Sequence, residues 1–315
     1  MEPPGTAELR AGDSRVVIVP ALGARIVALE LAGRQWLWTA PGLDAALARG
    51  GANGTELGGL DECFPTVAAA TIELGADTLS LPEGGELAAR RAETHIATPD
   101  GVMEAVSTWH GERLPFRFVR TVRLTADAQM EMTYEAVNDG KRPFPFIWAA
   151  RPIFALTQAT RILVPQRARV RVAAQRGIEL GAVGVEHQWP NVKLEKRVLD
   201  LSRPERVARK YGCKLFVDPV GGTIALEEPP LRLELIVDPR EVPDIGIWIN
   251  RRGGAPGKWG RGVNLVSLQP AIGAPDSLAD ALGTWKGAHQ LRPGKPRRWT
   301  VRWRVRRVED VRPEP

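Results

Sequence analysis

Cysteine is scarce in this sequence. Only Cys63 and Cys213 occur among 315 residues, and neither belongs to a set with metal-ligand spacing. Disulfide frameworks and zinc centres both need several cysteines, or cysteines with histidines, at short regular intervals. We therefore predict two separate reduced thiols, no disulfide and no metal site.

Long apolar runs and a leader-like start are also missing. No stretch approaches the ~20 apolar residues that a membrane-spanning helix needs. The opening MEPPGTAELR has neither the basic nor the apolar segment of a signal peptide. The glycine-rich GANGTELGG lacks the spacing of a phosphate loop. These absences predict a cytoplasmic protein that contacts no membrane and needs no cofactor.

Helical periodicity is rare, and only LDAALARG and the stretch around SLADAL show it. Many short antiparallel strands with little helix predict an all-β fold, a large antiparallel β-sandwich. With 43% hydrophobic residues the chain can bury a substantial core, and we predict one domain over residues 1–315. The strand signals are β-branched and aromatic runs bounded by turn residues, namely SRVVIVP, ARIVALEL, RQWLW, RFVRTVRL, QMEMTYEAV, TRILVPQ, TIALEE, LRLELIV, DIGIWIN and WTVRWRV.

The basic balance of the chain, a formal net charge of +6, raises the question of nucleic-acid binding. The densest basic segment, RRWTVRWRVRRV, alternates tryptophan and valine with threonine and arginine. That period of two is typical of a strand with one buried face and one solvated face. We therefore expect a solvated strand face and no nucleic-acid partner.

Four Gly- and Pro-rich segments place polar or aromatic side chains at strand ends, where a sandwich exposes its loops. They are GGLDECFPT, LPEGGELAAR, FPFIWAARPIF, and IGIWINRRGG with SLQPAIGAPDSL. Their order and content resemble the galactose mutarotase-like superfamily, in particular its aldose 1-epimerase-like branch. The likeness extends over nearly the whole chain through ARIVALELAGRQWLW, EHQWP, YGCKLFV and LRPGKPRRWTV. The resemblance implies a mutarotase-like sandwich with a sugar as its ligand.

In active members of that superfamily, two histidines and a glutamate surround the sugar ring. Opening a hemiacetal requires a base at the anomeric hydroxyl and an acid at the ring oxygen. The resemblance places these three positions at Gly84, Arg151 and Gln269. Glycine has no side chain, arginine stays protonated at any working pH, and a glutamine amide is no carboxylate base. We therefore predict that the usual acid–base set is replaced and that ordinary mutarotation is lost.

Arg151 then stands where the family has an acid, as a fixed cation. Guanidinium groups favour carboxylate, sulfate or phosphate partners, so we predict an anionic sugar or sugar-like ligand. Arg90 and Arg252, in neighbouring motifs, are candidates to add to that charge. The alternative is that Arg151 pairs internally with Asp61 or Glu62 in an altered pocket.

Four further residues are candidate ligand contacts. Gln269 can both donate to and accept from sugar hydroxyls, or serve as a loop amide. Trp148 and Trp248 offer ring faces to a sugar, although aromatic residues on strands commonly belong to the core. Asp276 is a candidate for binding a hydroxyl, or for capping the short helix that follows.

Three residues are candidates to replace the missing acid and base: His187 in EHQWP, Lys214 in YGCKLFV and Glu62. A desolvated lysine titrates closer to neutrality than a free one. The sequence thus favours a sugar-binding protein, which would make it a pseudoenzyme, over two enzyme alternatives. One alternative is a divergent aldose epimerase or isomerase; the other is an enzyme that uses the pocket for another step on a ring-bearing substrate. No motif encodes the ligand's identity or the oligomeric state.

Overall fold

The computed structural model describes residues 5–43, 57–165, 168–194, 197–207, 210–217, 221–252 and 262–310. Antiparallel strands dominate these residues, as the sequence predicts, and the short helix expected around SLADAL is α2 (Leu278–Leu282). This helix begins where the Ser277 hydroxyl accepts a hydrogen bond from the backbone N–H of Asp280. Most of the other predicted helix, LDAALARG, lies outside the described residues. No helix in the described ranges is long and apolar enough to cross a membrane.

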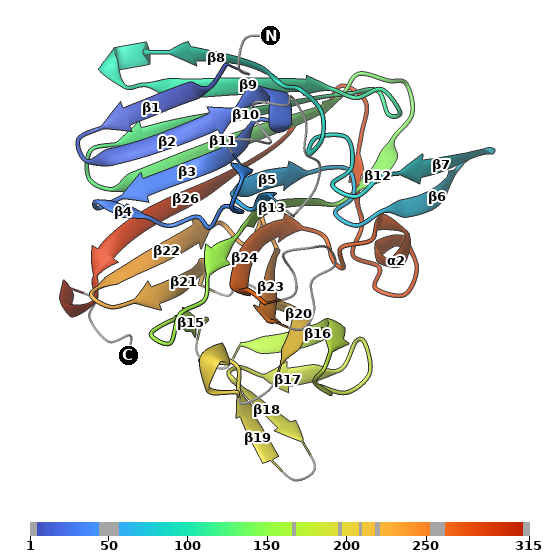
Figure 1. Ribbon diagram of the computed structural model, residues 1–315. Helices are drawn as coiled ribbons and strands as arrows, with labels where there is room; N and C mark the ends of the chain where they lie inside the picture. Colours follow the sequence, from blue (N-terminus) through green and yellow to red (C-terminus); the bar gives the residue numbers. More distant parts are fainter. Residues whose placement is uncertain are drawn as a thin grey trace.

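The larger of two main sheets has fourteen strands and runs through the middle of the molecule (Figure 1). Its central strands, β5, β13, β24, β23 and β20, carry the residues considered below. In spatial order the main path is β1 (Ala7–Ala11), β2 (Ser14–Val19), β3 (Arg25–Leu31), β5 (Leu60–Cys63), β13 (Trp148–Pro152), β24 (Asn264–Ile272), β23 (Asp244–Arg251), β20 (Tyr211–Val217), β16 (Arg169–Arg176), β17 (Glu186–Gln188), β18 (Asn191–Leu194) and β19 (Arg197–Asp200), with β4 (Arg34–Gln35) beside β3 and β14 (Phe154–Ala155) beside β24.

The second main sheet has eight strands and packs against the first. Figure 1 shows the two layers, with β1 to β3 in front of β9 to β11. The sheet order is β15 (Arg161–Leu163), β21 (Thr223–Glu228), β22 (Leu231–Val237), β26 (Arg297–Arg307), β11 (Gln129–Asn138), β10 (Phe116–Thr125), β9 (Glu104–His110) and β8 (Glu93–Ala97). One continuous hydrophobic core lies between the sheets, and each fully buried large side chain contributes about 1.5–3 kcal/mol.

The basic C-terminal strand β26 confirms the predicted alternation. Trp299, Val301 and Trp303 are buried in the core, whereas the arginines that alternate with the apolar residues along the strand face outward. These arginines pair with glutamates on the two neighbouring strands; Arg302 Nε lies 2.6 Å from Glu131 and Arg304 Nη2 lies 2.7 Å from Glu234. The positive charge of this segment is therefore distributed along a solvated sheet face with acidic partners.

Two small sheets and α2 complete the described structure: β6 (Ala70–Leu74) with β7 (Asp77–Leu81), and β12 (Phe144–Phe146) with β25 (His289–Leu291). The β6–β7 hairpin and α2 pack on the side of the large sheet that faces away from the core, through a small apolar cluster that includes Cys63, Ala149 and Ala271. We call this side the outer face of the large sheet. The 3₁₀ turns are η1 (Pro20–Leu22), η3 (Pro99–Gly101), η4 (Pro204–Arg206) and η5 (Val308–Asp310).

Candidate functional site

Polar side chains gather on the outer face of the large sheet because successive residues of a strand point to opposite sides. On β5, Asp61 points outward while Glu62 points into the core. On β13, Arg151 is outward and Trp148 is inward. The same alternation puts Lys214 of β20 and Gln269 of β24 on the outer face. Because the strand order is β5, β13, β24, β23, β20, these side chains lie on the same part of the sheet as Asp61 and Arg151.

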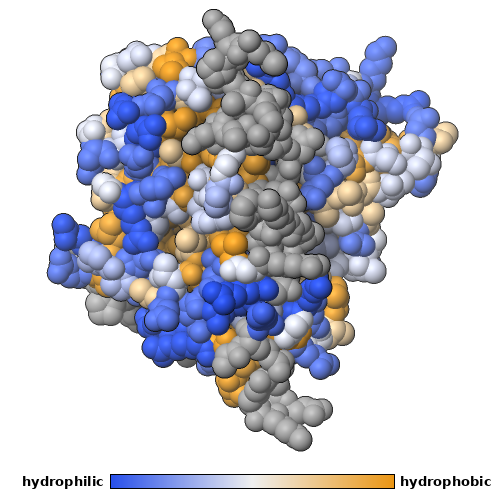
Figure 2. Space-filling view, in the orientation of Figure 1, coloured by the Kyte–Doolittle hydropathy of each residue, from blue (hydrophilic) through white to orange (hydrophobic). Residues whose placement is uncertain are grey.

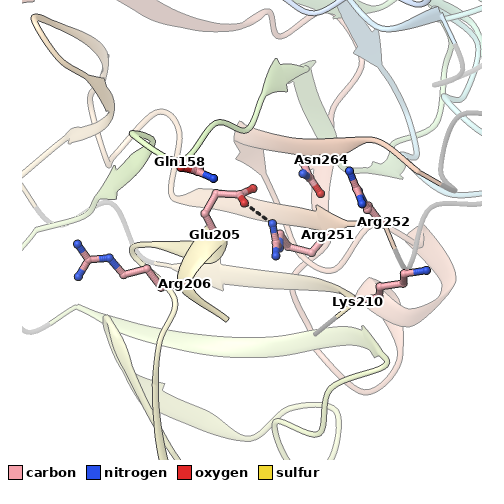
Figure 3. Close-up of a pocket in the computed structure, with 7 residues that line it drawn as sticks. All are labelled: Gln158, Glu205, Arg206, Lys210, Arg251, Arg252 and Asn264. Carbon is pink, nitrogen blue, oxygen red and sulfur yellow. Dashed lines mark hydrogen bonds and ion pairs between the residues drawn. The ribbon is translucent and has the colours of Figure 1, made fainter. Parts of the chain in front are cut away.

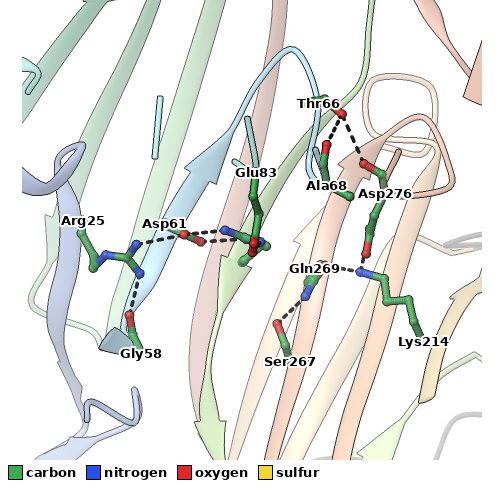
Figure 4. A network of polar contacts seen from close by, with 11 residues as sticks. Arg25, Gly58, Asp61, Thr66, Ala68, Glu83, Lys214, Ser267, Gln269 and Asp276 are labelled. Atoms are coloured by element: carbon green, nitrogen blue, oxygen red, sulfur yellow. Dashed lines mark hydrogen bonds and ion pairs between the residues drawn. The ribbon is translucent and has the colours of Figure 1, made fainter. Parts of the chain in front are cut away.

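The first half of this site is a chain of charged groups built on Asp61 (Figure 4). Arg151 donates two hydrogen bonds to its carboxylate, from Nε to Oδ1 at 3.0 Å and from Nη2 to Oδ2 at 2.8 Å. Arg25 of β3 donates to the same carboxylate at 3.0 Å and to the carbonyl of Gly58 at 2.8 Å. The remaining Nη1 of Arg151 reaches the half-exposed Glu83 at 3.4 Å. A buried carboxylate therefore joins two guanidinium groups.

These partners set the charge of Asp61. Burial by itself raises the pKa of a carboxyl group, but Arg151 and then Arg25 outweigh it and lower the pKa of Asp61 to about 2. The same pairing holds the pKa of Arg151 well above its usual range, against the effect of burial. Asp61 and Arg151 therefore stay ionised at working pH and cannot exchange protons with a substrate.

The second half of the site is built on Lys214, whose ammonium group is a donor to two groups. It donates to the side-chain oxygen of Gln269 and lies 3.0 Å from Oδ1 of Asp276. The amide nitrogen of Gln269 donates in turn to the Ser267 hydroxyl at 3.1 Å. The backbone carbonyl of Asp276 is held by the N–H groups of residues 67 and 68, so its loop is fixed beside the sheet.

Gly246, on the strand between those of Lys214 and Gln269, makes this arrangement possible. A Cβ atom there would lie 2.7 Å from Nζ and 2.8 Å from Cε of Lys214. The lysine side chain therefore crosses the sheet over a position that only glycine leaves open.

In this site, Lys214 is the titratable group whose pKa is shifted towards neutrality. Burial lowers the pKa of its ammonium group, Asp276 opposes this, and the charge of Arg151 adds to the lowering. Cys63 lies within electrostatic range of the same groups, but burial raises the pKa of its thiol well above the usual value. Lys214 is therefore a candidate for proton transfer, and Cys63 is an inert thiol.

We call the eight side chains of both halves the polar cluster: Arg25, Asp61, Glu83, Arg151, Lys214, Ser267, Gln269 and Asp276. Its ionisable members are three cations and three carboxylates, so the formal charges balance. The three motif positions come together here as well. A Cβ on Gly84 would lie 3.7 Å from Nη2 of Arg151. The pairing of β13 and β14 with β24 puts Arg151 beside Gln269 on the neighbouring strand.

Four of the residues singled out from the sequence belong to this cluster: Arg151, Lys214, Gln269 and Asp276. Of the two interpretations of Arg151, the structure has the internal pairing, and the partner is Asp61. Trp248 is half-buried on the outer face of β23, directly across from Lys214 on one side and Ser267 on the other. It is therefore a neighbour of the cluster.

Two predicted site residues point the other way and are corrected. Glu62 and Trp148 are both 0% exposed, and the indole Nε1 of Trp148 donates to Glu62 at 3.0 Å inside the sandwich. Arg120 at 3.2 Å and the hydroxyl of Tyr134 at 3.0 Å complete the surroundings of Glu62. A sugar on the outer face cannot reach either residue, because the sheet lies between.

Three other predicted residues lie away from the cluster. His187 is on β17, towards the end of the large sheet, and its Nε2 is 2.6 Å from the carbonyl oxygen of Leu180. Arg90 pairs with Glu112 and lies 3.7 Å from Glu86. Arg252 follows β23 and lines a separate cavity, described below.

Arg25, Glu83 and Ser267 were missed by the sequence analysis. Ser267 could have been found, because it lies two residues from Gln269 on the same strand and so shares its face. Arg25 and Glu83 reach the site from distant segments, and no local pattern marks them.

Comparison with solved structures identifies the fold. The Slr1438 protein from Synechocystis is 14% identical with a TM-score of 0.73, and 96% of each chain is covered. A galactose mutarotase related enzyme from Lactobacillus acidophilus is 16% identical with a TM-score of 0.67, covering 98% of this chain and 100% of the other. An aldose epimerase homologue from C. elegans is 12% identical with a TM-score of 0.65, covering 96% and 99%.

The structural neighbours thus include galactose mutarotase-like and aldose 1-epimerase-like proteins, and this chain has their β-sandwich fold. No family model matches the sequence, and no curated protein sequence matches it. At these identities the likeness establishes the fold, and the chemistry has to be argued from the site.

Proposed function

We propose that this protein binds a carbohydrate at the polar cluster and does not interconvert anomers by the acid–base route of mutarotases. The main support for this proposal comes from the three positions at which the resemblance expects the acid and base. They are Gly84, Arg151 and Gln269; they lie together at one site, and none of the three can transfer a proton. The mutarotase-like fold supports a sugar as the ligand.

The side chains of the cluster suit a polyhydroxylated ligand. Each sugar hydroxyl is both a donor and an acceptor, and the cluster offers ammonium, amide, hydroxyl and carboxylate groups on adjacent strands. Asp276 and Glu83 are its more open members, with 34% and 53% of their side chains exposed. Trp248 beside Lys214 supplies an aromatic surface for the C–H groups of a ring.

The predicted anionic character of the ligand finds no support in this geometry. Asp61 accepts from Nε and Nη2 of Arg151, Glu83 pairs with its Nη1, and Asp276 accompanies Lys214. Since three cations meet three carboxylates, no net positive charge remains to select an anion. We therefore propose a neutral sugar.

A second candidate function is a divergent epimerase or isomerase in which Lys214 transfers the proton. The observation that favours it is the lowered pKa of the buried ammonium group together with Asp276 at 3.0 Å. A neutral lysine amine is a competent base, and the adjacent carboxyl group is within reach of the proton.

Proton NMR of neutral aldoses, uronic acids and sugar phosphates mixed with the protein separates these functions. Line broadening reports binding, and exchange cross-peaks between anomers report catalysis. We expect neutral aldoses to broaden without added exchange, Gln269→Leu to abolish the broadening, and Gln290→Leu, an exposed glutamine elsewhere, to leave it intact.

Two outcomes change the conclusion. Anomer exchange well above the buffer rate that disappears in Lys214→Met supports the second candidate and overturns the first. If no sugar broadens, or if Gln269→Leu binds as well as the unaltered protein, the cluster is not a carbohydrate site.

A further inference from the structure

A second polar site lies at one end of the sandwich, on the other face of β23 from the polar cluster. It is a cavity of about 630 Å³ (Figure 3). Along β23 it is five residues beyond Gly246, roughly 16 Å at the rise of a strand. The lining comes from the link before β15, from η4, and from the ends of β20, β23 and β24, with the residues Gln158, Glu205, Arg206, Lys210, Arg251, Arg252 and Asn264.

The charge of this cavity is strongly positive, in contrast to the balanced polar cluster. Arg251 and Glu205 form an ion pair, which neutralises one cation. Arg206, Lys210 and Arg252 are exposed, and in the described part of the chain no ion pair or side-chain hydrogen bond engages them. These three cations therefore line the cavity without a carboxylate partner among the described residues. Figure 2 shows strongly hydrophilic residues over the lower part of the molecule, where β15 lies in Figure 1.

The ion pair at the centre of the cavity is also incompletely hydrogen-bonded. Within the described ranges, Nε of Arg251, Oε1 of Glu205 and Oδ1 of Asn264 are buried atoms with no hydrogen-bond partner. Leaving such atoms unpaired is unfavourable, so a ligand in the cavity that draws these side chains towards it would satisfy them. One is a donor that needs an acceptor, and two are acceptors that need donors.

We propose that this basic cavity binds a small phosphate ester that also carries hydroxyl groups. A phosphate group supplies acceptor oxygens for the exposed Arg252 and Lys210, and guanidinium groups bind it well. The hydroxyl groups of the same molecule supply donors for Glu205 and Asn264. The cavity volume lies within the range of small-molecule sites. This site is separate from the carbohydrate site proposed above and does not depend on it.

Isothermal titration calorimetry at about 0.15 M salt tests the proposal with three probes: glucose 6-phosphate, inorganic phosphate and a short DNA duplex. We expect glucose 6-phosphate to bind, and to bind about tenfold more tightly than inorganic phosphate because of its hydroxyl contacts. Equal affinity for the two would remove the hydroxyl part of the proposal. Binding of the duplex alone would overturn it in favour of nucleic acid.

Charge-removing variants locate the site. The double variant Lys210→Ala with Arg252→Ala should weaken glucose 6-phosphate binding by about ten- to a hundredfold, since two charge-assisted contacts are lost. Arg292→Ala with Lys295→Ala removes the same two charges at an exposed turn elsewhere and should leave the affinity unchanged. Gln269→Leu should leave it unchanged as well. Equal weakening by both charge variants, no weakening by the first, or loss with Gln269→Leu alone would each refute this assignment.

Discussion

Asp61 and Glu62 are consecutive residues of one strand, both completely buried, and their carboxyl groups behave in opposite ways. The pKa of Asp61 is lowered to about 2, whereas that of Glu62 is raised to about 7. Burial is the largest influence on each and raises both values. The difference comes from the partners, since Asp61 has the two guanidinium groups of Arg25 and Arg151, but Glu62 has Arg120 and two neutral donors.

In this sheet, the carboxyl group that a ligand could reach is therefore not the one that titrates near neutral pH. The outer face carries Asp61, a member of the polar cluster, whose carboxylate stays ionised down to about pH 2. The inner face carries a carboxyl group that titrates near neutral pH but is enclosed by Tyr134, Trp148 and the core. A titratable group can act on a ligand only where the ligand can reach it. Among the described groups of the outer face, Lys214 is the one whose pKa is shifted towards neutrality.

The largest effect is expected from removing the cation next to Glu62. Arg120→Met leaves that carboxyl group without its charged partner in the core and should lower the free energy of unfolding by about 3–5 kcal/mol. Arg151→Met is the matched change on the outer face, and because Arg25 still holds Asp61 it should cost about 1–3 kcal/mol. Urea unfolding measures both; equal losses would show that partner number does not distinguish the two carboxyl groups.

The pH dependence of stability should be the next largest difference. The pKa of Glu62 is about 4.3 in an unfolded chain and about 7 when folded. Its contribution is therefore fully present below about pH 4.3 and is lost as the pH rises through about 7. We expect a decline of a few kcal/mol over that interval. Asp61 acts oppositely, because its lowered pKa stabilises the fold above about pH 4 and that contribution is lost towards about pH 2.

Unfolding measured at several pH values checks this, with Glu62→Gln expected to flatten the decline and the exposed Glu93→Gln expected to keep it. A decline that persists in Glu62→Gln would assign it to another group.

The smallest effect concerns a neutral donor of Glu62. Tyr134→Phe removes the hydroxyl that donates to Glu62 at 3.0 Å, so it should cost about 1 kcal/mol and raise the pKa of that carboxyl group further. Tyr211 is the other tyrosine of the chain, and its buried hydroxyl has no hydrogen-bond partner in the described ranges. Tyr211→Phe should therefore leave stability nearly unchanged. Urea unfolding of the pair tests the contrast, and identical losses would contradict it.

Much of the fold could be predicted from the sequence, because alternation of apolar and polar residues is a local property. The alternation in β26 and the order of the Gly- and Pro-rich motifs led to the β-sandwich that the structure confirms. The pairing of strands into fourteen- and eight-stranded sheets depends on distant contacts and could not be obtained in that way. A single domain and a cytoplasmic location stay predictions.

The candidate site was predicted less completely, and part of the shortfall was avoidable. Trp148 and Arg151 are three residues apart on one strand, so they cannot face the same side. The same rule separates Glu62 from Asp61. The contacts of Arg25 and Glu83 with the cluster, by contrast, join segments that no local pattern relates.

The indole of Trp148 lies where its fluorescence can respond to the protonation of Glu62. Its Nε1 is bonded to the carboxyl group, and its ring packs edge-on against Tyr134 at 4.8 Å and Trp299 at 5.0 Å, shielded from solvent. Light absorbed and emitted by this ring is sensitive to a charge appearing beside it. The sandwich therefore contains its own optical reporter for the gain or loss of a proton at its centre.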